Sequence, residues 1–102
     1  MSDKYILDGH EAIPIDDLHA WGTWFQTAER HVAQDLLPGG IHISTVFLGL
    51  DHRFGEDGPP LIFETMVFGG EYDQFQERYS TWEEAEKGHA EILSRVKAAL
   101  EH

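Results

Sequence analysis

The stretch that decides the fold covers residues 44–70 and reads STVFLGLDHRFGEDGPPLIFETMVFGG. It contains most of two apolar runs, 41–51 and 61–68, which are rich in β-branched and aromatic residues. Such runs are typical of strands, and the loop between them, with two glycines and two prolines, is typical of a hairpin connection. The sequence therefore predicts a central antiparallel hairpin.

The predicted register of this hairpin places Leu48 opposite Glu64 and Val46 opposite Met66 on one face. The other face would carry Ile43, Thr45, Phe47, Phe63, Thr65 and Val67. Both faces are then largely apolar, whereas a sheet wetted on one side should alternate more cleanly. Either helices cover both faces, or one face packs against a second subunit. Because only two helices are expected, we predict a homodimer.

The N-terminal third predicts a hairpin followed by a helix. KYILDGHEAIPI (4–15) reads as two short strands around an Asp8-Gly9 turn, with Pro14 restricting the second strand to an edge. Asp16 is the expected N-cap of a helix over 17–33, which LLPGG (36–40) would end. The expected buried stripe of this helix is Leu18, Trp21, Phe25, Ala28 and Val32, widened by Trp24.

The C-terminal part predicts one more strand and a long helix. QERYST (76–81) is expected to be a third antiparallel strand or an extended arm, and Ser80 or Thr81 begins a capping-box pattern. A helix over 82–100 follows, with the expected stripe Trp82, Ala85, His89, Ile92, Val96 and Ala99. The element order is β-β-α-β-β-β-α, which predicts an α+β domain with two amphipathic helices packed on an antiparallel sheet.

Length and charge set limits on the function. The chain has 102 residues, no cysteine and a formal net charge of −12, so we expect a single domain over 1–99 without disulfides or thiolate metal sites. The final Leu-Glu-His (100–102) is interpreted as a vector-derived tail. An acidic surface disfavours direct nucleic-acid binding. Without a membrane-spanning run or a signal peptide, we expect a cytoplasmic protein.

The candidate chemistry lies in a set of carboxylates and imidazoles. Its members are Asp51, His52, Glu64 and His89, with His42 and His10 in reserve. Such groups can bind zinc or act as acid and base, but their spacing matches no metal-ligand motif, so no metal or cofactor is assigned. The structural alternative is that His89 is a core histidine bonded to a backbone carbonyl or to Glu64, and that Asp51 caps loop amides.

Glu64 is the least expected of these residues, because a lone carboxylate within an apolar strand needs a partner. The available donors are Arg53, Arg78, His89, Tyr79 and Trp82, and an Arg78 pair across neighbouring strands is the favoured structural answer. A polar group in a ligand pocket is the functional alternative. The candidate ligand- or partner-binding residues are Asp51, His52, Phe54, Glu64, Arg78, Tyr79, Trp82 and His89.

Three blocks of the chain resemble a known group of proteins: STVFLGLDH (44–52), GPPLIFETMVFGG (58–70) and RYSTWEEAEKGH (78–89). They are similar to a family of small uncharacterised bacteriophage, prophage and actinobacterial proteins. The resemblance extends over most of the chain and implies a small cytosolic accessory protein of phage origin. It implies no catalytic residue.

Three functions follow from these observations. The first is a non-enzymatic binding protein, homodimeric, that engages a host protein or small ligand through a sheet face or the loop at 53–59. The second is a small metal-dependent hydrolase that uses His52, Glu64 and His89. The third is an acidic mimic of nucleic acid that inhibits a DNA- or RNA-binding enzyme.

Overall fold

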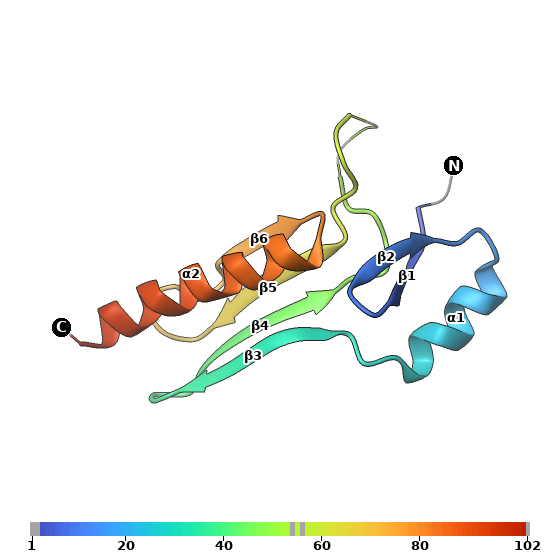
Figure 1. Ribbon diagram of the computed structural model, residues 1–102. Helices are drawn as coiled ribbons and strands as arrows, with labels where there is room; N and C mark the ends of the chain where they lie inside the picture. Colours follow the sequence, from blue (N-terminus) through green and yellow to red (C-terminus); the bar gives the residue numbers. More distant parts are fainter. Residues whose placement is uncertain (1–2, 54, 56, 102) are drawn as a thin grey trace.

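The computed structural model describes residues 3–53, 55 and 57–101 (Figure 1). Within them, one long helix packs on a four-stranded antiparallel sheet, and a two-stranded hairpin with a short helix lies at one end of that sheet. The predicted α+β class with antiparallel pairing is confirmed. The order of the described elements is β-β-α-β-β-β-β-α, one strand more than predicted.

The N-terminal hairpin forms as predicted. Strands β1 (Tyr5–Asp8) and β2 (Glu11–Pro14) pair antiparallel, with Tyr5 opposite Pro14. The turn needs Gly9, whose φ of 63° lies in the left-handed region that favours glycine. Helix α1 (Leu18–Thr27) follows and is capped by Asp17, one residue later than predicted.

The region after α1 corrects the sequence prediction. The helix was expected to reach residue 33, but it ends at Thr27 because Ala28 is extended, with φ −73° and ψ 141°. Strand β3 (His31–Leu37) occupies the remainder, and Pro38 to Gly40 form the turn into the next strand instead of a helix end. The expected buried stripe is also wrong: Leu18 is 63% exposed, no residue of α1 is fully buried, and Ala28 and Val32 lie outside the helix.

The large sheet has the order β3-β4-β5-β6 in the described chain, and each strand pairs antiparallel with its neighbour in sequence. Its other strands are β4 (Ile41–Phe47), β5 (Phe63–Phe68) and β6 (Gln76–Tyr79). The predicted strand at 76–81 is therefore confirmed, although β6 ends two residues earlier.

The central register differs from the prediction by two residues, since Val46 opposes Glu64 and not Met66. The cause is that residues 49–51 leave the hairpin and pair with the N-terminal segment. The carbonyl of Gly49 accepts a hydrogen bond from Tyr5 N (2.8 Å), and Leu50 bridges to the N-terminal segment. A shift of two preserves the alternation of side chains, so the predicted division between the two faces is correct.

Helix α2 (Trp82–Leu100) begins with the expected capping box. Of the two possible boxes the chain uses Thr81 with Glu84: the Glu84 amide donates to the Thr81 side chain, and the Glu84 carboxylate accepts from the Thr81 amide. The buried side of α2 consists of Ala85, Gly88, His89, Ile92 and Val96, which is close to the predicted stripe.

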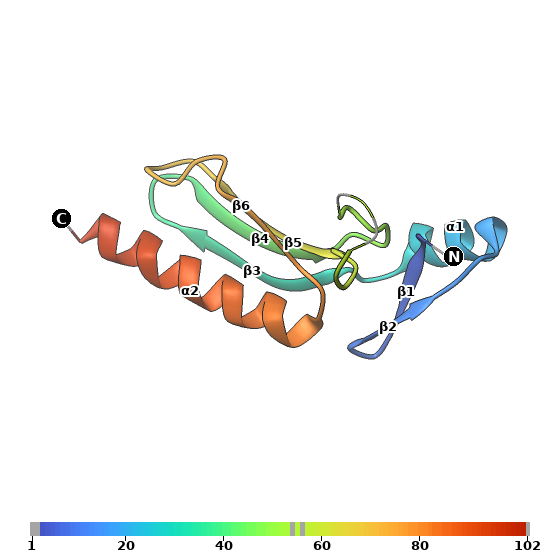
Figure 2. The same ribbon diagram turned by 90° about the horizontal axis from the view of Figure 1, so that it is seen from above.

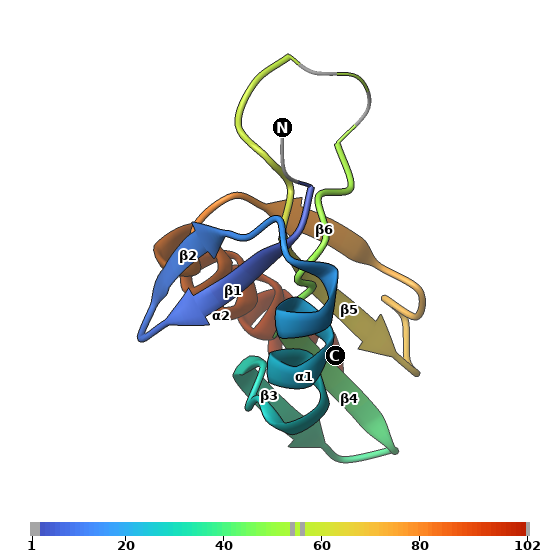
Figure 3. The same cartoon turned by 90° about the vertical axis from the view of Figure 1, so that its right-hand side faces the viewer.

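The core lies between α2 and one face of the sheet. Figure 2 shows α2 along that face, and Figure 3 shows the N-terminal hairpin and α1 at the end of the sheet. The fully buried strand residues are Ile43, Thr45, Phe47, Phe63, Thr65 and Val67, the six residues predicted to share this face. The opposite face carries no helix of the described chain. No described helix is long and apolar enough to cross a membrane.

Candidate functional site

The uncovered face of the sheet is defined by side chains that alternate with the buried ones. It consists of His31, Gln34 and Leu36 from β3, His42, Ser44 and Val46 from β4, Glu64, Met66 and Phe68 from β5, and Gln76 and Arg78 from β6. Leu36 and Phe68 are exposed and Val46 and Met66 half-buried, so the face is partly apolar. Period-two alternation of the strands places these residues together.

Glu64 has the partner predicted as its structural answer. Arg78 Nε donates to Glu64 Oε2 over 2.9 Å, and Gln76 Nε2 donates to the same oxygen. Direct pairing of Glu64 with Arg78 across β5 and β6 brings the groups together. The Glu64 side chain is 12% exposed, so this carboxylate is mostly covered and is neutralised within the face.

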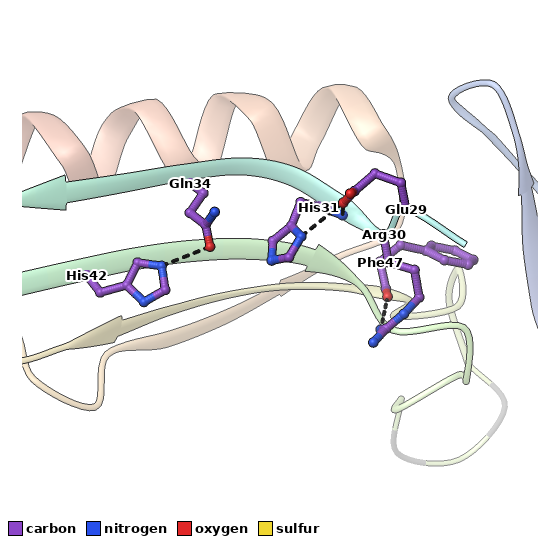
Figure 4. Close-up of polar contacts among 6 residues, drawn as sticks. All are labelled: Glu29, Arg30, His31, Gln34, His42 and Phe47. Atoms are coloured by element: carbon purple, nitrogen blue, oxygen red, sulfur yellow. Dashed lines mark hydrogen bonds and ion pairs between the residues drawn. The ribbon is translucent and has the colours of Figure 1, made fainter. Parts of the chain in front are cut away.

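Two histidines lie on the same face and make local contacts (Figure 4). His42 Nε2 lies 3.1 Å from Gln34 Oε1, and His31 Nδ1 lies 3.0 Å from Glu29 Oε1. At the end of β4, Arg30 Nη1 donates to the Phe47 carbonyl oxygen over 3.0 Å (Figure 4). Sequence reasoning kept His42 in reserve but missed His31, because it assigned His31 to a helix.

His89 belongs to a hydrogen-bonded chain on the other side of the sheet. Its Nδ1 lies 2.7 Å from Thr45 Oγ1, which lies 2.5 Å from Thr65 Oγ1, and its Nε2 lies 2.7 Å from Asp35 Oδ2. His89 is therefore a core histidine, as the structural alternative held, but its partners are neither a backbone carbonyl nor Glu64. Sequence reasoning missed Asp35 because β3 was not predicted.

The hydrogen bonds from Asp35 through His89 to Thr45 have the connectivity of an activated nucleophile, but the histidine and the threonine are too deeply buried to act on a substrate. Thr45 and Thr65 have no exposed surface, and His89 is 4% exposed. A substrate cannot reach either hydroxyl without displacing α2. These hydrogen bonds instead satisfy buried polar groups and connect α2 to β3, β4 and β5.

Asp51 organises the start of the loop between β4 and β5. Its Oδ1 accepts hydrogen bonds from the amides of Arg53 and Leu61, both 3.0 Å, as the predicted capping role requires, and its Oδ2 pairs with Arg53 Nε at 2.7 Å. Burial raises the pKa of Asp51, but these amides and the Arg53 charge outweigh it and hold the pKa below its ordinary value. His52 is exposed in this loop, and Phe54 lies outside the described residues.

Tyr79 and Trp82 lie on the helix side of the sheet. Tyr79 is buried, which raises its pKa above the ordinary value, and its ring lies against Gly88 of α2. Trp82 stacks on His10 at a centroid distance of 3.9 Å. Both were among the predicted donors to Glu64, but no described hydrogen bond joins either of them to that carboxylate. Of the predicted donors, Arg78 is the one with a described hydrogen bond to Glu64, and Gln76, which was not predicted, donates the second.

The structure does not bring the proposed hydrolase residues together. Glu64 lies on the uncovered face, His89 on the covered face and His52 in the loop. Among the described residues no group of three or more His, Asp or Glu side chains has metal-binding geometry. The uncovered face carries apolar side chains, amide and imidazole hydrogen-bonding groups and one neutralised ion pair. These groups suit binding to another molecule.

No family model, curated protein or solved structure matches this chain.

Proposed function

We propose that this protein is a non-enzymatic binding protein that works as a homodimer, with the uncovered faces of two sheets packed against each other. The observation that supports this most strongly is the uncovered face itself. Its centre carries Val46 and Met66 beside the internally paired Glu64 and Arg78, and its ends carry Leu36 and Phe68. Apolar side chains together with polar groups that are already paired are an ordinary composition for a protein interface.

The low charge of this face is compatible with a second copy as its occupant. Two copies of a chain with a net charge of −12 repel each other, so they can approach only where negative charge is low. Among the described residues of the face, Glu64 is the one acid, and Arg78 neutralises it. Most other acids of the chain lie elsewhere, in the hairpin, the loops and the outer side of α2.

The two other functions have weaker support. The separation of His52, Glu64 and His89 leaves the hydrolase without an assembled site. A nucleic-acid mimic would need its acids along one face, whereas the described acids are distributed over the hairpin, the loops and α2. A dimeric accessory protein that binds a host protein or small ligand also agrees with the resemblance to small phage proteins.

Sedimentation velocity on untagged protein at tens of micromolar tests the proposal. Met66→Glu places a second carboxylate beside Glu64 at the centre of the face, whereas Ala90→Glu adds the same charge on the exposed side of α2. We expect wild type and Ala90→Glu to sediment as dimers and Met66→Glu as a folded monomer. A monomeric wild type, or a dimeric Met66→Glu protein, would show that the face is not the interface.

A further inference from the structure

A second surface feature lies at the junction between the N-terminal hairpin and the start of α2. There, β2 and the first turn of α2 line an open cavity of about 350 Å³. Its lining includes His10, Glu11, Ala12, Phe63, Trp82 and Glu83. This volume is at the lower end of the range for small-molecule sites and suits a single side chain with its adjoining backbone.

The walls of this cavity are aromatic. The imidazole of His10 stacks on the indole of Trp82 with the ring planes 5° apart, and Phe63 meets the same indole edge-on at a centroid distance of 6.3 Å. His10 is exposed at the hairpin turn, so it can move aside at low cost. The stack demonstrates that this indole face receives a flat, polar ring at contact distance, which is the geometry in which a guanidinium stacks on tryptophan.

The charge of the cavity is negative. Glu11 and Glu83 are exposed, and neither forms an ion pair or side-chain hydrogen bond with another described residue. An anion is disfavoured here although α2 begins beside the cavity. The Glu84 carboxylate already accepts from the amides of Ser80 and Thr81, and Glu83 and Glu84 offset the positive end of the helix dipole.

From these observations we propose that the cavity binds an arginine side chain from a basic segment of a partner protein. The guanidinium stacks on Trp82 in place of His10 and pairs with Glu11 and Glu83. The cavity has room for the backbone that adjoins the side chain, and a partner segment supplies that backbone where a free cation would not. This inference rests on the proposed binding function and names the chemistry of its partner.

The test is a ¹H–¹⁵N NMR titration with two capped tripeptides, acetyl-Gly-Arg-Gly-amide and the neutral acetyl-Gly-Gln-Gly-amide. We expect the arginine peptide alone to shift the resonances of Trp82 and its neighbours around the cavity. Glu11→Gln/Glu83→Gln should weaken this binding at least about fivefold, as two partly exposed ion pairs would. The matched control, Glu71→Gln/Glu91→Gln, removes the same charge from exposed sites outside the cavity lining and should bind normally.

Three results would overturn the inference: no cavity shifts with the arginine peptide, equal shifts with the glutamine peptide, or equal weakening by the control pair. The outcome is separable from that of the dimer proposal. Met66→Glu should become monomeric and still bind the arginine peptide, while Glu11→Gln/Glu83→Gln should remain dimeric.

Discussion

The close packing of Gly88 against Tyr79 predicts that a larger residue at position 88 lowers the stability of the protein. A Cβ atom added at Gly88 would lie 2.2 Å from Tyr79 Oη and 2.4 Å from two carbons of the ring, closer than any real contact. The ring cannot easily move away, because Tyr79 is buried in the core between β6 and α2. Gly88→Ala must therefore displace either the tyrosine or the helix.

The magnitude follows from two opposing effects. Overpacking a core costs about 1–3 kcal/mol, and the severity of this overlap places the cost at the upper end. Replacing glycine inside a helix recovers up to about 1 kcal/mol. We expect Gly88→Ala to lower the free energy of unfolding by about 2 kcal/mol, which corresponds to a fall of about 8 °C in Tm.

Gly22 provides the matched control, because it lies inside α1 and an added Cβ there meets nothing within 4 Å. Gly22→Ala should raise the free energy of unfolding by about 0.5–1 kcal/mol through helix propensity alone. Urea unfolding followed by circular dichroism at 222 nm measures both variants. In a Tyr79→Leu background the ring is gone, and Gly88→Ala should become neutral or stabilising. If Gly88→Ala stabilises the wild-type protein as Gly22→Ala does, the packing argument is wrong.

Three further predictions concern polar contacts. Asp51→Asn should lower the free energy of unfolding by about 2 kcal/mol near neutral pH, as loss of a buried charged hydrogen-bond acceptor does. Because the folded-state pKa of Asp51 lies below its ordinary value of 3.8, this difference in stability from wild type should persist above about pH 5 and shrink as the pH falls below 3.8. Urea unfolding at a series of pH values measures it, and the absence of such convergence would contradict the role assigned to Asp51. Thr45→Val leaves His89 Nδ1 without its partner and should lower the free energy of unfolding by about 1–3 kcal/mol, more than the exposed Thr23→Val change does. Equal losses of stability in the two variants would argue against the buried hydrogen bonds of His89. Trp21→Phe removes hydrogen bonds from the indole N–H to the carbonyls of Tyr5 and Gly49 (3.1 and 3.2 Å), so hydrogen exchange in β1 should accelerate while exchange in α2 stays unchanged; slow exchange in β1 would count against this link.

The sequence supported accurate predictions where local pattern and tertiary environment agree. Alternation along 41–47 and 63–68 identified the buried face, and the capping box located the start of α2. A carboxylate inside an apolar strand needs a partner, and this requirement correctly predicted the ion pair between Glu64 and Arg78. In each case the periodicity or the chemistry of a few neighbouring residues decides the outcome.

The sequence failed where distant pairing overrides local preference. Residues 31–37 contain good helix formers at helical spacing, yet pairing with β4 makes them an edge strand. Missing β3 removed Asp35 from consideration as the partner of His89 and placed His31 on the wrong kind of element. The register error has the same origin, since residues 49–51 pair with the N-terminal segment instead of continuing the hairpin.

The central claim is that two copies meet through their uncovered sheet faces, and an isotope-filtered NOE experiment tests it most directly. The sample is an equimolar mixture of ¹³C-labelled and unlabelled protein at a concentration where sedimentation detects association. We predict intermolecular NOEs to the methyl groups of Val46 and Met66, at the centre of the face. Intermolecular NOEs confined to α2 or to the N-terminal hairpin, with none at Val46 and Met66, would contradict the account.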